Sequence, residues 1–125
     1  MEMISFGSAD IDTKISQMSG DEIDCLVFGA IQLDGKGTIL AYNSTEGEIT
    51  GRDQKAVLGQ NFFTDVAPCT NQRGFRDRFD DGVRNNNLNT LVEWTFDHQM
   101  APTKVQVHMK KAAVPDRYWM FVKRL

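Results

Sequence analysis

The last third of the chain contains three short segments that fit β-strands, and they constrain the fold more than any other feature. Residues 91–96 and 105–110 alternate between apolar and polar side chains, which is typical of strands with one buried face. Residues 118–122 are apolar almost throughout, which predicts the central strand of a sheet. We therefore predict three antiparallel strands here, with His98 and His108 at the strand surface.

Two further strands are predicted in the first half of the chain. Residues 28–33 and 38–42 are largely apolar, and the turn between them contains two glycines, which is typical of a hairpin. Helices or helical turns are expected at residues 43–49, 54–58, 62–66 and 73–87, with Asp53 capping the second and with Gly51 and Gly59 ending the first two. This order predicts an α+β fold, in which short helices cover one face of a five-stranded antiparallel sheet.

Residues 1–26 form a polar lead-in to this sheet. Ile11, Ile15 and Met18 stand at helical spacing, and a second short turn is expected at residues 22–26. Because the segment has few large apolar side chains, we expect it to pack loosely on the rest. A length of 125 residues fits one domain, 1–125, with residues 1–26 as an N-terminal cap and residues 27–125 as the core.

Charge and composition exclude several classes of protein. The net charge is −3, and the chain has no cluster of basic residues with interleaved aromatic ones, so we expect no nucleic-acid partner. We find neither a secretory leader nor a run of transmembrane length, and we expect a cytoplasmic monomer without a membrane partner. The only cysteines, Cys25 and Cys69, are expected to be reduced, and Cys25 is expected to be buried in the core.

Cys69 follows the apolar segment 61–67 and comes directly after a proline. Pro68 has a fixed φ and no N–H group, so it ends any helix that runs through residues 62–66. The Cys69 thiol therefore stands on irregular backbone. Residue chemistry leaves two interpretations open, a small buried apolar side chain or a nucleophile or attachment point.

Specific motifs across almost the whole chain give a resemblance to a known family. They include residues 28–35, Tyr42-Asn43 with Glu46-Gly47, residues 49–53, residues 61–70, Gln99-Met100, residues 107–111 and residues 121–124. These motifs resemble the photoactive yellow protein family, which comprises small blue-light receptors with the PAS fold. This resemblance favours the attachment-point interpretation of Cys69.

The resemblance implies a cofactor and a set of site residues. Cys69 would carry p-coumaric acid (trans-4-hydroxycinnamic acid) as a thioester, and the pocket would be formed by Tyr42, Glu46, Thr50, Arg52, Phe62, Phe96 and Met100. Light would isomerise the chromophore from trans to cis, Glu46 would donate a proton, and partial unfolding would give the signalling state before thermal recovery. The resemblance implies neither an enzymatic reaction nor a metal, and it does not identify the downstream signalling partner.

The chemistry of the residues is consistent with these roles. Tyr42, Glu46 and Thr50 are four positions apart, so a helical turn would bring them to one side. A buried glutamate without a cationic partner stays protonated and can donate a hydrogen bond. The competing interpretation is that Glu46 completes a helix-capping box with Asn43 and that Arg52 is a solvated cation at a helix end.

The sequence departs from the family pattern at two positions, and three alternative functions remain open. Trp94 and His98 stand where the family usually has tyrosine, which affects the expected colour, recovery rate and pH response. The main alternative is a PAS sensor or interaction module that lacks this chromophore or binds another ligand. A thiol hydrolase would need His98 or His108 beside Cys69, and a metal site lacks any paired ligand spacing.

Overall fold

A five-stranded antiparallel sheet forms the centre of the protein. The computed structural model describes residues 5–125, so expectations for residues 1–4 lie outside the described residues. The strands are β1 (Gly29–Leu33), β2 (Ile39–Tyr42), β3 (Asn89–Phe96), β4 (Thr103–Lys111) and β5 (Tyr118–Arg124). They lie in the order β2-β1-β5-β4-β3, and every neighbouring pair is antiparallel. The predicted sheet is confirmed, and the most apolar strand, β5, is central.

The helices are short. They are α1 (Ile11–Ser16), α2 (Gly20–Asp24), α3 (Ser44–Thr50), the π-helical turn η1 (Phe62–Val66), the 3-10 turn η2 (Pro68–Thr70) and α4 (Arg76–Arg84). The predicted helix at residues 73–87 is therefore shorter at both ends. Gly74 and Asn86 have φ values of 89° and 55°, which a right-handed helix cannot accommodate.

The predicted helix at residues 54–58 is wrong, because these residues form turns. Asp53 does cap the segment, since its side chain accepts a hydrogen bond from the Lys55 N–H. Gly59 has a φ of 83° and donates to the carbonyl of Ile39, which directs the chain back to the edge of the sheet. The segment therefore bonds to the sheet edge and does not form the predicted helix.

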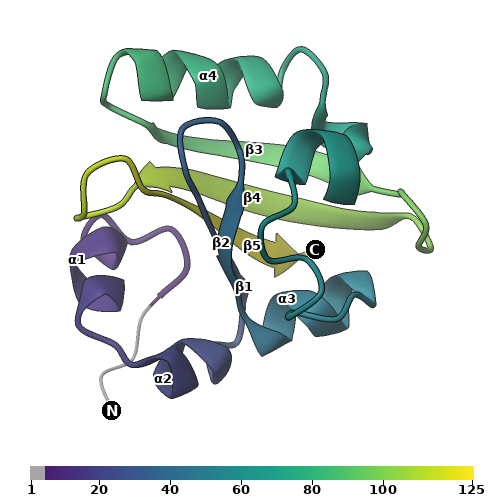
Figure 1. Ribbon diagram of the computed structural model, residues 1–125, viewed down its shortest axis with the longest axis horizontal. Coiled ribbons are helices and arrows are strands. Elements are labelled where there is room, and N and C mark those ends of the chain that lie inside the picture. Colours follow the sequence, from purple (N-terminus) through teal and green to yellow (C-terminus); the bar gives the residue numbers. More distant parts are fainter. Residues whose placement is uncertain (1–4) are drawn as a thin grey trace.

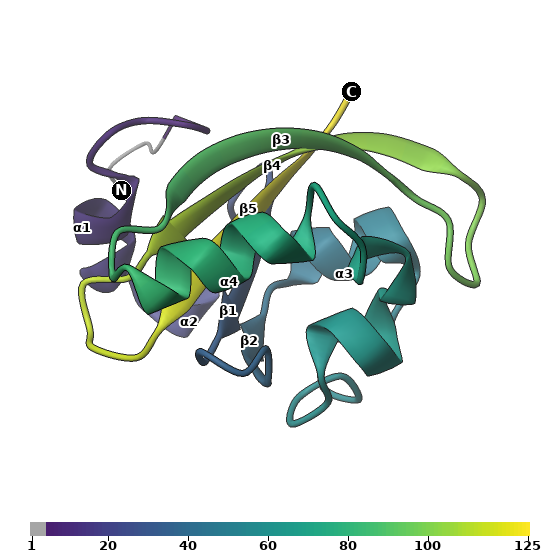
Figure 2. The same cartoon turned by 90° about the horizontal axis from the view of Figure 1, so that it is seen from above.

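The sheet has a separate apolar core on each face. On one face, α3, η1 and α4 bury a large cluster that includes Phe62, Phe63, Phe75 and Phe79. Figure 2 shows α3 and α4 on the same side of the strands. On the other face, a smaller cluster joins the lead-in to residues such as Trp119 and Phe121 of β5. Figure 1 shows the lead-in helices α1 and α2 together at the lower left, apart from α4.

The lead-in is anchored more firmly than its composition suggests. Ile11 and Ile15 of α1 are 0% and 1% exposed, and both belong to the smaller cluster. At the end of β4, the Lys110 ammonium group donates to the carbonyl of Ala9 at 2.6 Å and lies 3.4 Å from the Asp12 carboxylate. Two buried isoleucines and one partly buried lysine therefore hold the segment to the sheet.

The lead-in also explains why the prediction for His108 was wrong. His108 is only 3% exposed, because its ring lies between Phe6 of the lead-in and Phe121 of β5. Its Nε2 atom lies 2.8 Å from Oδ1 of Asn89, and its Nδ1 atom has no hydrogen-bond partner among the described residues. Burial, assisted by the charge of Lys110, lowers the pKa of His108 below its ordinary value.

Replacement of Ile15 by alanine tests this anchoring. We expect Ile15→Ala to lower the free energy of unfolding by about 2–4 kcal/mol, because it leaves a cavity between α1 and the sheet. Hydrogen exchange should also become faster in α1 and α2. The control Val27→Ala alters a side chain that is 92% exposed, and it should change the free energy by less than ~0.5 kcal/mol. Equal effects of the two changes would contradict the packing described here.

Candidate functional site

The side chain of Asn43 fixes the start of α3. Its Oδ1 atom accepts hydrogen bonds from the N–H groups of Ala30 and Glu46 at 2.9 and 3.0 Å. Its Nδ2 atom donates to the carbonyls of Ile23 and Phe28 at 2.9 and 3.2 Å. Asn43 therefore caps the helix as predicted, and it also joins α3 to β1 and to the end of the lead-in.

The Glu46 carboxyl group does not complete a capping box. Glu46 is 0% exposed, and neither of its carboxyl oxygens has a hydrogen-bond partner among the described residues. Burial raises the pKa of Glu46 to about 8, although the charge of Arg124 acts in the opposite direction. At neutral pH Glu46 is therefore mainly a neutral carboxylic acid, with an O–H group that can donate a hydrogen bond.

Tyr42 and Thr50 lie beside Glu46 and form a hydroxyl pair. Tyr42 Oη lies 2.7 Å from Thr50 Oγ1, and Thr50 Oγ1 also lies 2.9 Å from the backbone carbonyl of Glu46. Thr50 has one hydroxyl hydrogen, so it donates either to that carbonyl or to Tyr42. In the second arrangement the Tyr42 hydrogen is free for another acceptor. Burial, followed by the nearby Glu46 charge, raises the pKa of Tyr42.

Two consecutive helical turns position Cys69. The side chain of Asn61 caps η1 by accepting hydrogen bonds from the N–H groups of Phe63 and Thr64. Pro68 then starts η2, and the Thr70 hydroxyl donates to the carbonyl of Ala67 at 2.6 Å. The predicted helix end at Pro68 is confirmed, and the half-buried Cys69 stands inside a well-bonded turn.

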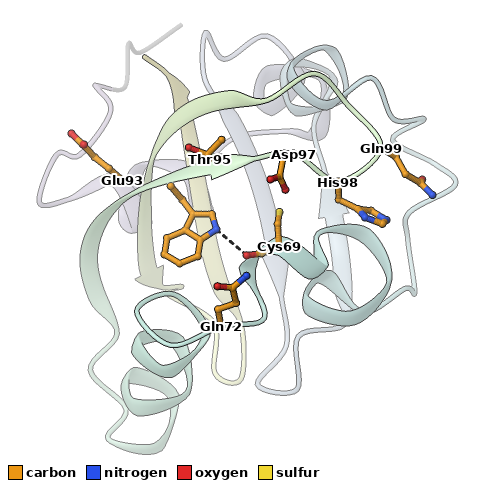
Figure 3. A pocket seen from close by; sticks show the side chains of 8 residues that line it. Cys69, Gln72, Glu93, Thr95, Asp97, His98 and Gln99 are labelled. Atoms are coloured by element: carbon orange, nitrogen blue, oxygen red, sulfur yellow. Dashed lines mark hydrogen bonds between the residues drawn. The ribbon is translucent and has the colours of Figure 1, made fainter.

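Trp94 supports this turn from β3. Its indole N–H donates to the backbone carbonyl of Cys69 at 3.0 Å, the bond drawn as a dashed line in Figure 3. This bond lies beside a surface groove of about 680 Å³, which is lined by Cys69, Gln72, Glu93, Trp94, Thr95, Asp97, His98 and Gln99. In Figure 3 the side chain of Asp97 is directed toward Cys69, whereas that of Glu93 points away. The groove gives Cys69 a solvent-facing side.

The inner side of Cys69 faces a narrow cavity. Its lining contains every site residue expected from the sequence, together with Val66, Ala67 and His98: Tyr42, Glu46, Thr50, Arg52, Phe62, Val66, Ala67, Cys69, Phe96, His98 and Met100. The volume of this cavity is only about 10 Å³, which is room for one water at most. Thiol, carboxyl and phenol groups thus meet in a nearly dry space.

Arg52 closes one side of this cavity. Its Nη2 atom donates to the backbone carbonyl of His98 at 2.8 Å, which joins the segment after α3 to the loop between β3 and β4. Arg52 is therefore half-buried and hydrogen-bonded, which contradicts the competing interpretation of a solvated cation at a helix end. The expectation that His98 lies at a strand surface is wrong, because His98 stands in this loop and contributes its main-chain carbonyl.

This geometry bears on the thiol-hydrolase and metal-site alternatives. The His108 ring packs against Phe6 and Phe121 and does not line the cavity, and no hydrogen bond joins His98 to Cys69 within residues 5–125. The same residues contain no group of three histidine, cysteine, aspartate or glutamate side chains that could hold a metal ion. Cys25 is a free thiol at the end of α2, and it is exposed, so the prediction that it is buried was wrong.

Comparison with known proteins identifies close relatives. A family model described as the PAS fold matches residues 22–123. The chain is 57% identical to photoactive yellow proteins from Halochromatium salexigens and Rhodothalassium salexigens, with 100% of each chain covered. It superimposes on the photoactive yellow protein domain of the sensor histidine kinase Ppr from Rhodospirillum centenum with a TM-score of 0.86 and 50% identity, covering 90% of this chain and 99% of that one.

The raised pKa of Glu46 predicts how stability depends on pH in the protein without a bound ligand. Between about pH 4.5 and 8 the folded state keeps a proton on Glu46 that the unfolded state has released. The free energy of unfolding should therefore fall by a few kcal/mol as the pH rises through this window. Glu46→Gln should remove most of the fall, because glutamine does not titrate.

Urea unfolding at several pH values between 5 and 8 measures this effect. The control Glu48→Gln changes an exposed carboxylate on the same helix and should leave the fall in place. An unchanged pH dependence in Glu46→Gln would mean that Glu46 is ionised in the folded protein at neutral pH.

Proposed function

Because the chain belongs to the photoactive yellow protein family of PAS-fold photoreceptors, we propose that it senses blue light through p-coumaric acid bound to Cys69 as a thioester. The observation that carries the proposal is the unpartnered carboxyl group of Glu46 in a cavity that is also lined by the Cys69 thiol. When bound, the chromophore supplies light absorption and a double bond that isomerises from trans to cis. The proposal assigns no enzymatic reaction to the chain.

The donors around the cavity fit a ligand with a buried anionic oxygen. Burying a carboxyl group without a hydrogen bond is unfavourable, so Glu46 favours a ligand that supplies an acceptor. Tyr42 can supply a second donor when Thr50 turns its hydroxyl hydrogen toward Tyr42. An ionised phenol is such an acceptor, and two donors in a dry space would keep it charged below its ordinary pKa of about 10.

The other lining residues would orient the ring and exclude water. Phe62 and Phe96 are buried and offer flat apolar surfaces, and Met100 is a flexible side chain that can adapt to a changed ring position. Arg52 would shield the cavity through its hydrogen bond to His98. In this proposal Glu46 would hold its proton in the dark and would transfer it to the phenolate oxygen of the chromophore after light absorption. The carboxylate that remains in an apolar space would destabilise the folded state.

The second candidate is a PAS module that has no such chromophore or binds another ligand. It is favoured only by the narrowness of the cavity, which requires some side chains to move for any ligand. The absorption spectrum after supply of an activated p-coumaroyl thioester distinguishes the two. We expect a yellow protein that bleaches in blue light and recovers in the dark, whereas a colourless product would favour the second candidate.

The position of the thiol predicts a single attachment site. Cys69→Ser should abolish stable attachment and visible absorption, because its hydroxyl group does not form a thioester. Cys25→Ser should retain both, since Cys25 is exposed and does not line the cavity. Mass spectrometry of peptides from the reconstituted protein is the measurement, and a hydroxycinnamoyl adduct on Cys25 would contradict the assignment.

Glu46 is expected to be the proton donor. Glu46→Gln keeps a donor of similar shape, but a weaker one, and it removes the proton that could be released. Absorption should therefore move to longer wavelength, because the ionised chromophore is less stabilised in the ground state. In the unmodified protein, an infrared difference spectrum should lose a protonated carboxylic acid band on illumination. If no such band is lost, Glu46 is not the donor.

We further propose that residues 1–26 act as a cap on a core of residues 27–125 and that the cap transmits the signal. The support is structural proximity, since Asn43 caps the helix that carries Glu46 and also binds Ile23 of the lead-in. The relative in a sensor histidine kinase suggests a signalling partner of that general kind. No helix in residues 5–125 is long and apolar enough to cross a membrane.

Hydrogen exchange in darkness and under illumination tests the cap. Amide exchange should rise most in α1 and α2, because a new buried charge on Glu46 would strain the Asn43 contacts. The central strand β5 serves as the internal reference and should change least. Equal exchange rates of α1 and α2 in the two conditions would exclude residues 1–26 as the switching element.

A further inference from the structure

We propose that Gly29 of β1 is the positioning residue for the Glu46 carboxyl group and, through it, a determinant of the chromophore's colour. The first part concerns only these two residues of the chain, and the second part rests on the proposed function. Gly29 is buried at the start of β1, and α3 packs against this strand. Neither carboxyl oxygen of Glu46 has a hydrogen-bond partner among the described residues, so its relation to Gly29 is one of shape.

The space that a side chain at position 29 would need is occupied by Glu46. A Cβ atom built on Gly29 would overlap Oε2 of Glu46, and it would lie only 2.9 Å from Cδ and 3.1 Å from Cβ of the same side chain. All three nearest atoms therefore belong to Glu46. The carboxyl group rests against the bare backbone of β1, and any larger residue would force it to move.

The backbone does not itself require glycine at this position. Positive φ values are recorded for Gly7, Gly37, Gly51, Gly59 and Gly74, and Gly29 is not among them. An alanine at position 29 is therefore compatible with the strand, and the three atoms nearest to its methyl group would all belong to Glu46. An effect of Gly29→Ala on stability should therefore come from the contact with Glu46, and not from a backbone conformation that only glycine adopts.

Displacement of Glu46 would be difficult to accommodate. Its main chain lies within α3 and its N–H group donates to Asn43, so displacement falls mainly on the side-chain torsions. The remaining space in the cavity is too small for a second position of the carboxyl group without movement of its neighbours. Gly29 thus leaves open the one space in which the Glu46 carboxyl group fits and faces the cavity.

A double-mutant cycle in the protein without chromophore tests the contact. Gly29→Ala should raise the unfolding equilibrium constant by roughly tenfold or more, because it overpacks the site. In a Glu46→Ala background the same change should have little effect or should lower that constant, because the methyl group enters the space that the carboxyl group has left. The control Gly20→Ala adds a methyl group where nothing lies within 4 Å, and it should show no such dependence on residue 46.

The reconstituted protein supplies a measurement that stability alone would not move. Gly29→Ala should shift the absorption band to longer wavelength and move the carbonyl stretching band of protonated Glu46, because displacement weakens the hydrogen bond that this residue donates. In the Glu46→Ala background, Gly29→Ala should leave the absorption band unchanged. Gly20→Ala should leave both bands in place.

The outcomes separate this inference from the proposed function. If Gly29→Ala and Glu46→Ala are energetically coupled, and if Gly29→Ala shifts both the absorption band and the carbonyl band, the inference and the proposed function are both supported. Coupling and a moved carbonyl band without a shift in absorption would keep Gly29 as the positioning residue and would contradict the role of Glu46 at the chromophore. Absence of coupling would overturn the inference. If Gly29→Ala alone does not fold, folding of the double variant supports the inference, and failure of both overturns it.

Discussion

The site depends on one unfavourable burial, that of the Glu46 carboxyl group without a hydrogen-bond partner. Transfer of a charged carboxylate into such a space is far more costly than transfer of the neutral acid, so the folded protein retains the proton. This requirement organises the surrounding structure. Asn43 fixes the helix that carries the group, β1 leaves room for it at Gly29, and aromatic side chains keep water away. A group in this state can both donate a hydrogen bond and release a proton.

The sequence predicted the sheet well, because alternating apolar residues and a continuous apolar strand report directly on burial. It predicted helices less well where local propensity competed with the sheet. The segment after Asp53 begins as a helix would, yet Gly59 bonds to Ile39 at the sheet edge instead. His108 lies on the polar side of an alternating strand, and only the packing of Phe6 from a distant segment shows that this side is also buried.

The residues that the resemblance assigns to a chromophore pocket line one cavity in the structure, but the resemblance could not supply the contacts among them. Spacing placed Tyr42, Glu46 and Thr50 near one another, and the structure agrees, although Tyr42 belongs to β2 and not to a helix. No sequence pattern distinguishes a glutamate that completes a capping box from one whose carboxyl group turns inward. Likewise, the hydrogen bond from Trp94 to the carbonyl of Cys69 depends on the register of β3 against η2. Such features arise from tertiary packing, which local sequence does not encode.

The Asn43 amide uses its full hydrogen-bonding capacity, with two bonds accepted and two donated, and its four partners lie in three different parts of the chain. A saturated group of this kind cannot turn to follow one partner without losing the others. Small displacements of Glu46 should therefore be absorbed with no visible effect at Ile23, whereas a displacement large enough to break one bond should weaken all four together. The junction would then behave as a threshold element, which converts a gradual distortion on one side of the sheet into an abrupt release on the other.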